Sequence, residues 1–160
     1  MSISLKDLVG YRGEKLFELA ISEYSMFPQP LFRPGFLGEK WPAIDFYVEL
    51  LGVRRRTPFF FVQVKSTAAA IPFGATHLNV SLPPKKREFL FRVPGPTYLA
   101  GVHEPSRRTF ILSINAQSPQ GVYKMPLQHE LNPANLQILY NEVKAFWNSH
   151  DYKPQNSHFV

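Results

Sequence analysis

The chain has 160 residues, of which 44% are hydrophobic and 19% charged; this suits one folded domain with a buried core and excludes a disordered chain. It contains no cysteine, which excludes disulfides and thiolate metal sites, and no apolar stretch near the roughly 18 residues of a membrane span. The net charge of +6 favours a polyanionic partner. We therefore expect a single cytoplasmic domain over residues 1–160 that binds DNA and no membrane.

The first expected element is a helix over residues 12–24, RGEKLFELAISEY. Its apolar residues share one face at about 100° per residue: Leu16, Phe17, Ala20, Ile21 and Tyr24. Glu14 and Glu18 lie at the edge of that face. The proline-punctuated residues 25–42 are expected to form a loop.

Two strands are expected next, over residues 44–51 and 59–67, joined by a short basic loop. The first, IDFYVELL, alternates its side chains between two faces. The second, FFFVQVKST, is apolar on both faces as far as Gln63, as expected of a central strand covered on both sides. The short connection favours an antiparallel hairpin.

This hairpin would gather polar side chains at one end. If Leu51 lies opposite Phe59, then Asp45 lies opposite Lys65. Because strand side chains alternate with a period of two, Asp45, Gln63 and Lys65 then share one face at one end of the hairpin.

The remaining elements complete a mixed α+β domain of the broad α/β class, in the order α-β-β-β-α-β-β-α. They are a strand over 77–82 with Leu78, Val80 and Leu82 inward, a short helix opened by Pro84 and running through 93, strands over 97–104 and 108–115, and a last helix capped by Asn132 with Pro133 in its first turn.

The polar end of the hairpin has the chemistry of a divalent-cation site. Magnesium prefers hard oxygen ligands, commonly one or two carboxylates with waters and substrate phosphate. Asp45 would supply the charged ligand, while the Gln63 amide oxygen and the Val64 carbonyl would supply neutral ones. Lys65 would hold or deprotonate a water, or stabilise charge on a phosphate.

A carboxylate of the first helix, Glu14 or Glu18, would add a further ligand directly or through water. The plain alternatives stay open: a lysine at a strand end often reaches into water, and two glutamates often form a solvated helix face.

These residues resemble a known family. A helix glutamate in "RGEKLFELAISEY", a strand aspartate in "AIDFYVELL" and the QxK of "FFFVQVKST" are similar to the PD-(D/E)xK nuclease superfamily, in its QxK, Mrr-like variant, and to short nuclease-like domains of unknown function within it. The resemblance covers roughly residues 10–115 well and the last helix loosely. It implies a restriction-endonuclease-like core, a mixed sheet flanked by helices, and Mg²⁺-dependent hydrolysis of DNA phosphodiesters with Mn²⁺ as a substitute.

The resemblance also implies roles for individual residues. Asp45 matches the metal-binding aspartate, Lys65 the catalytic lysine and Glu18 the catalytic and metal-binding helix glutamate, with Glu14 as the second match. Gln63 takes the place of the second acidic ligand. This replacement removes a negative charge and leaves a second hypothesis open, an inactive nuclease-fold module that binds nucleic acid or a partner protein. A third is a purely structural or interaction subunit.

Candidate DNA contacts lie in two places. Lys85, Lys86 and Arg87 open the short helix, where basic residues oppose the helix dipole, so a purely structural role is less natural. Thr67 follows the lysine motif, although β-propensity explains it equally well. Since one active site cuts one strand, double-strand cleavage would require a homodimer. The alternative expected partner is another protein of a larger defence or DNA-processing system.

Overall fold

The computed structural model describes residues 3–38, 40–54, 56–115, 124–150 and 156–159. Within them the chain order is α1 (Leu5–Ile21), β1 (Phe32–Phe36), β2 (Phe46–Leu50), β3 (Phe59–Thr67), β4 (His77–Asn79), α2 (Pro84–Arg92), β5 (Thr97–His103), β6 (Arg108–Ser113), β7 (Lys124–Pro126), a 3₁₀ turn (Leu127–His129) and α3 (Pro133–Asn148). The expected mixed α+β class is confirmed. No helix of the described part is long and apolar enough to cross a membrane.

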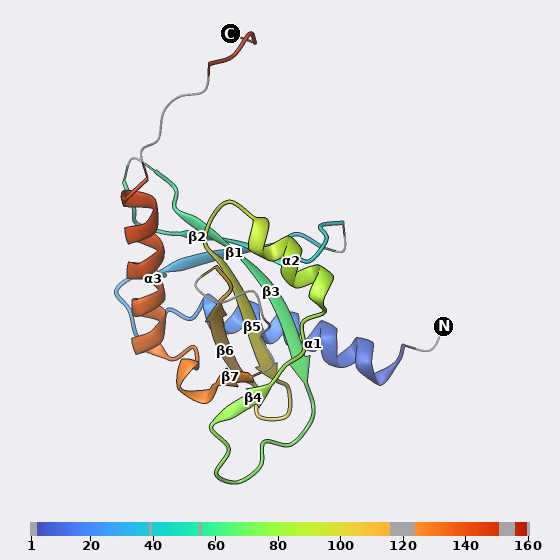
Figure 1. Ribbon diagram of the computed structural model, residues 1–160. Coiled ribbons are helices and arrows are strands. Elements are labelled where there is room, and N and C mark those ends of the chain that lie inside the picture. The colour runs from blue at the N-terminus through green and yellow to red at the C-terminus, as the bar shows by residue number, and fades with distance from the viewer. Residues whose placement is uncertain (1–2, 39, 55, 116–123, 151–155, 160) are drawn as a thin grey trace.

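A five-stranded sheet in the order β1-β2-β3-β5-β6 forms the centre of the fold (Figure 1). Strand β3 pairs antiparallel with β2 on one side and parallel with β5 on the other, and β6 returns antiparallel to β5. The parallel pair needs a crossover, which contains β4 and α2. Strands β4 and β7 form a separate two-stranded sheet.

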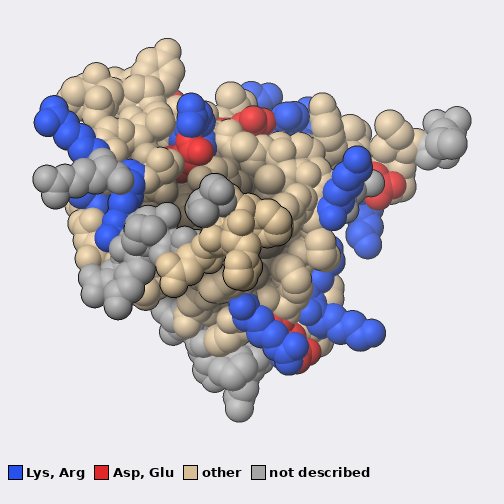
Figure 2. Space-filling view, turned by 90° about the horizontal axis from the view of Figure 1, so that it is seen from above, with Lys and Arg blue, Asp and Glu red and all other residues tan. Residues whose placement is uncertain are grey.

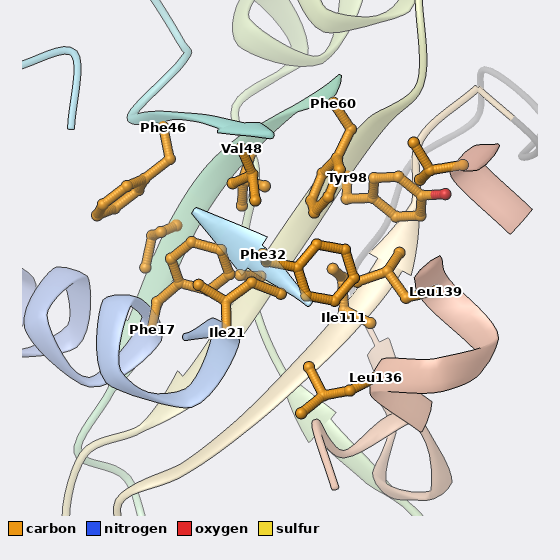
Figure 3. Packing of buried hydrophobic residues seen from close by; sticks show 14 of the residues in the cluster. Phe17, Ile21, Phe32, Phe46, Val48, Phe60, Tyr98, Ile111, Leu136 and Leu139 are labelled. Carbon is orange, nitrogen blue, oxygen red and sulfur yellow. The ribbon is translucent and has the colours of Figure 1, made fainter. Parts of the chain in front are cut away.

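Each face of the five-stranded sheet has its own apolar cluster. On one face, Phe17 and Ile21 of α1 and Leu136 of α3 pack against Phe46 and Phe60 of the sheet (Figure 3). The rings of Phe17 and Phe46 are 4.9 Å apart between centroids. The other face packs against α2 and the β4–β7 pair through a second cluster that includes Leu78, Leu90 and Met125. The apolar part of β3 is therefore a central strand covered on both faces, as predicted.

The first helix begins earlier and ends sooner than the predicted 12–24. Ser4 caps it: its hydroxyl accepts a hydrogen bond from the backbone N–H of Asp7 at 3.1 Å. The helix ends at Ile21, where the N–H of Ser22 bonds the carbonyl of Glu18 at 3.2 Å. The additional N-terminal turns extend the helix along the polar end of β3.

The loop predicted over 25–42 is wrong, because it contains β1. This strand pairs only with β2 in the sheet, so it is an edge strand and tolerates Pro34 on the side that needs no ladder hydrogen bond. The element order predicted from the sequence also lacked β7. The strand expected over residues 77–82 covers only His77–Asn79, although Leu78, Val80 and Leu82 are buried as predicted.

The predicted register of the β2–β3 hairpin is wrong by two residues. Glu49, not Leu51, lies opposite Phe59. The N–H of Leu51 instead bonds the carbonyl of Leu31 at 2.9 Å, and Gly52 turns the chain with φ of 73°, so the connection between the strands is longer than expected. A shift of two preserves the side-chain faces, and Asp45 now falls level with Gln63 instead of Lys65.

The later elements follow the prediction closely. Pro84 opens α2, and β5 and β6 form an antiparallel hairpin. Helix α3 starts after Asn132, whose side chain accepts from the N–H of Asn135 at 2.9 Å, and Pro133 stands in the first turn. Trp147 near the end of α3 donates from its indole nitrogen to the carbonyl of Phe59 at 2.7 Å, at the start of β3 and far from its polar end.

Candidate active site

Asp45 stands just before β2, with its backbone fixed on both sides. Its N–H bonds the carbonyl of Val62 and its carbonyl accepts from Leu37, each at 2.9 Å. Its Oδ2 accepts a hydrogen bond from the backbone N–H of Val64 at 2.6 Å and another from the side-chain Nε2 of Gln63. The carboxylate is thus held against the end of β3 by both main chain and side chain.

Gln63 links the other polar atoms of this group. Its side chain is only 3% exposed. Besides the bond to Asp45, its Nε2 donates to the carbonyl of Val64 at 3.1 Å, so one amide nitrogen lies between a carboxylate and a carbonyl oxygen. Its Oε1 is buried without a hydrogen-bond partner among the described residues. An unpartnered buried oxygen is rare in folded proteins, and an exchange of the two ends of this amide would turn it towards Asp45 and the Val64 carbonyl.

Burial disfavours the charged forms of both ionisable groups at this strand end. Desolvation raises the pKa of Asp45, against the opposing effects of the Val64 N–H, Lys65 and Lys86. Burial lowers the pKa of Lys65, and the nearby charge of Lys86 lowers it further, while Asp45 opposes both effects. Opposed perturbations on a carboxyl and an amine that share a cleft are typical of a functional site.

Two clefts meet at Asp45. The inner cleft, of about 570 Å³, runs over the end of β3 and includes Gln63, Lys65 and Thr67. The outer cleft, of about 1010 Å³, lies among α1, the β1–β2 connection and α2. Both are open grooves, and the residues that they share are Lys6, Gly10, Glu14, Asp45 and Lys86.

The structure brings most of the predicted site residues to these clefts. Those on the inner cleft are Glu14, Asp45, Gln63, Val64, Lys65, Thr67 and Lys86, and Lys85 lines the outer cleft. Glu18, the better sequence match of the two helix glutamates, lines neither cleft and forms an ion pair with Lys15 at 3.2 Å. Arg87 also lies outside both linings.

The position of Glu14 depends on the residue before it. A Cβ placed on Gly13 would lie 1.6 Å from the Oγ of Ser66 in β3, so only glycine lets α1 approach the strand this closely. Glu14 follows directly and faces the clefts beside Asp45. Because the helix glutamate is placed by this contact, the geometry favours Glu14 over Glu18 as a partner for Asp45.

Sequence patterns did not indicate several of the residues that line the outer cleft around Asp45. They are the exposed aromatic residues Tyr11, Phe36, Trp41 and Phe89, together with Lys6 and Lys15. Tyr11 and Lys6 lie outside the predicted helix, and Phe36 and Trp41 lie in the segment predicted as a loop. One signal was present for the helix start: Ser4 followed three residues later by the acidic Asp7 is similar to a capping box.

The donor set fits a magnesium ion that keeps several of its waters. Within the described ranges no three His, Asp or Glu side chains form a metal-binding cluster. The oxygens at this place are instead the carboxylates of Asp45 and Glu14, the carbonyl of Val64 and the Oε1 of Gln63. One or two carboxylates with neutral oxygens and water suit Mg²⁺ better than zinc or a softer metal.

The positive charge of the chain does not by itself locate this site. On the face shown in Figure 2, basic side chains occur in several separate groups around the rim, and acidic side chains lie beside a number of them. Comparisons of the chain with models of protein families, with curated proteins and with solved structures find no match. A functional assignment therefore depends on the geometry of the two clefts.

Proposed function

We propose that this protein is a Mg²⁺-dependent deoxyribonuclease with a restriction-endonuclease-like core, a QxK variant of the PD-(D/E)xK type. One observation carries the proposal: Asp45, Gln63 and Lys65 lie together at one strand end, in a cleft that also contains Glu14. The parallel β3–β5 pair inside an otherwise antiparallel sheet agrees with the mixed sheet expected of such a core.

In this proposal the chain holds the ion through Asp45, Gln63, Val64 and Glu14. A bound Mg²⁺ would supply a water of lowered pKa and neutralise charge on the scissile phosphate. Gln63 would have to turn its amide, so that Oε1 replaces Nε2 between Asp45 and the Val64 carbonyl. The two ends of an amide have nearly the same shape, so this exchange needs no repacking of the buried side chain.

Lys65 has two tasks in the proposed reaction. Burial and the neighbouring Lys86 lower its pKa, which increases the neutral fraction that can accept a proton from an attacking water. In its charged form it stabilises the negative charge that develops on the phosphate oxygens. Lys86, on the same cleft, would bind a neighbouring phosphate and hold the strand in place.

Cleavage of supercoiled plasmid with Mg²⁺ or Mn²⁺ tests the proposal. We expect nicking by the wild type and a loss of at least about 100-fold for Asp45→Ala and Lys65→Ala, as for removal of groups that act on the transition state. Glu14→Gln should lower the rate, whereas Glu18→Gln is the matched control on the same helix and should not. Equal nicking by the wild type and Lys65→Ala at matched purity would reject the site.

A second function is favoured by one specific contact. The Nε2 of Gln63 already donates to both Asp45 Oδ2 and the Val64 carbonyl, so these two oxygens have a hydrogen-bond partner without a cation. Such a site would suit a nuclease-fold module that binds nucleic acid or a partner protein without cutting. This module would show no Mg²⁺-dependent rise in melting temperature and no cleavage, yet would bind DNA with a marked salt dependence.

A further inference from the structure

The outer cleft combines aromatic and basic side chains in a way that the chemistry at Asp45 does not require. Tyr11 and Trp41 line it and are 60% and 52% exposed. Phe36 and Phe89 line it too and are also exposed. Large aromatic side chains normally bury their faces. Four of them around one groove indicate a ligand with flat apolar surfaces.

These aromatic residues come from three separate parts of the fold. Tyr11 lies on α1 and Phe89 on α2, while Phe36 ends β1. Trp41 lies in the β1–β2 connection, whose base is closed by the bond from the Leu37 N–H to the Asp45 carbonyl at 2.9 Å. The connection that presents Trp41 thus ends on the proposed catalytic aspartate, which lines both clefts.

Lysines accompany the rings on both helices. On α2, Lys85 and Lys86 lie four and three residues before Phe89, so all three fall on one helix face. On α1, Lys15 lies four residues after Tyr11, and its Nζ is 5.9 Å from the centroid of the Phe36 ring. On α2 the groove therefore offers positive charge for phosphates beside a ring for bases.

We propose that the outer cleft binds an unpaired nucleic-acid strand, with bases stacked on Trp41 and Tyr11 and phosphates beside Lys85 and Lys86. In a duplex the base faces are covered by neighbouring base pairs, so protein rings stack only on unpaired bases. The shared Asp45, Glu14 and Lys86 connect this cleft to the inner one. The inference rests on the proposed function, and names its substrate as single-stranded or locally unpaired DNA rather than intact duplex.

Fluorescence anisotropy in EDTA tests this without any cleavage. The probes are a labelled dodecamer of thymidine, the uridine dodecamer and a 12-base-pair duplex. We expect the thymidine strand to bind at least about 10-fold more tightly than the duplex, because each unpaired base that stacks on a protein ring adds affinity. The uridine arm shows whether the cleft also binds RNA, and tight binding there supports the same cleft. Equal or weaker binding of both strands relative to the duplex overturns the inference.

Substitutions of the rings locate the binding. Trp41→Ala and Tyr11→Ala should each weaken single-strand binding by roughly 5- to 100-fold and change duplex binding less than 2-fold. Tyr24→Ala is the matched control, since Tyr24 is 63% exposed, follows the other end of α1 and lies outside both cleft linings. If Tyr24→Ala weakens binding as much as Tyr11→Ala, the outer cleft is not the binding site.

A second measurement keeps all cleft residues in place, so its result does not depend on whether the cleft variants fold. The chain has two tryptophans, Trp41 and Trp147, and Trp147 lies on α3. In Trp147→Phe the remaining tryptophan fluorescence comes from Trp41, and stacking of thymidines should quench it in a saturable way. Unchanged emission under conditions where anisotropy shows binding would overturn the inference.

The outcomes separate this inference from the proposed nuclease. Single-strand binding in EDTA with no cleavage in Mg²⁺ would support the cleft and reject the nuclease. Plasmid cleavage that depends on Lys65, combined with equal affinity for strand and duplex, would support the nuclease and reject the cleft as a site for unpaired strands.

Discussion

The carboxylate of Asp45 lies in surroundings that disfavour its charge. It accepts the N–H of Val64 and lies near Lys65 and Lys86, yet burial outweighs these favourable contacts and raises its pKa. A carboxylate that served only stability would be expected to show the opposite balance, with its charged form favoured by the fold. Ionisable side chains whose charged form is disfavoured by burial are common at functional sites, and they lower the stability of the folded state.

We predict that Asp45→Asn makes the metal-free protein more stable at neutral pH. Because the folded state raises the pKa of Asp45 above its ordinary value, its contribution to stability is greatest below that value and is lost as the pH rises through the raised pKa. The melting temperature of the variant should therefore rise relative to that of the wild type as the pH increases. Thermal unfolding in EDTA between pH 3 and 8 measures this.

The local hydrogen bonds can adapt to this substitution. The amide oxygen at position 45 would still accept both the Val64 N–H and the Nε2–H of Gln63. Asp7→Asn is the control, since Asp7 lies in the first turn of α1, where the helix dipole favours a negative charge. A stability difference between wild type and Asp45→Asn that is flat or falls with pH would contradict the argument.

At the scale of elements, the prediction from sequence was good where a pattern had a single explanation. The strand β3 was predicted with its observed bounds, and the start of α3 was predicted at its Asn132 cap. Strand β1 was missed because Pro34 and Gly35 read as loop, and only its place at the sheet edge makes them acceptable. The start of α1 was missed because Leu5 and Leu8 are exposed and add nothing to an apolar stripe.

The candidate site was found in spite of an incorrect register. The error in pairing β2 with β3 was two residues, an even number, so Asp45, Gln63 and Lys65 kept their common face. The period of a strand determines such faces, whereas the register also depends on the length of the connection, which Gly52 and the bond from Leu51 to Leu31 decide. No periodic signal gives the exposure of Trp41, which depends on how three distant segments assemble.

The contact between α1 and β3 gives a prediction at this scale. Gly13→Ala would place a methyl group 1.6 Å from the Oγ of Ser66, so the helix must move away from the strand. We expect a loss of about 1–3 kcal/mol in the free energy of unfolding. If Glu14 acts with Asp45, cleavage should fall as well, because the shift carries Glu14 with it. Urea denaturation and the plasmid assay measure the two effects.

Gly10 provides a matched control on the same helix. A Cβ at Gly10 would meet nothing within 4 Å, so Gly10→Ala should be accepted and stabilise the helix by about 0.5–1 kcal/mol. Opposite signs for the two glycine substitutions support the close approach at Gly13. Equal effects would mean that α1 does not pack on Ser66 as described.

At the scale of the whole molecule, the net charge of +6 can act in two ways. It can attract any polyanion to the entire surface, or the useful part can be confined to the lysines of the clefts. The dispersed groups of basic side chains in Figure 2 make the distinction testable, because charges far from the clefts can be removed in equal number. Arg54 in the β2–β3 connection and Lys144 on α3 are suitable, since both lie away from the polar end of β3.

We predict that the salt dependence of binding follows the clefts and not the net charge. Each phosphate contact to a single strand contributes a slope of about −0.7 to the plot of log Kobs against log salt concentration. The double variant Lys85→Gln, Lys86→Gln should therefore reduce the slope by about 1.4. The double variant Arg54→Gln, Lys144→Gln makes the same change in net charge, from +6 to +4 (6 − 2 = 4), and should leave the slope unchanged. Titrations of the thymidine dodecamer at several salt concentrations measure the slope for each variant. If both double variants reduce the slope equally, the overall charge attracts the strand and not the lysines of α2.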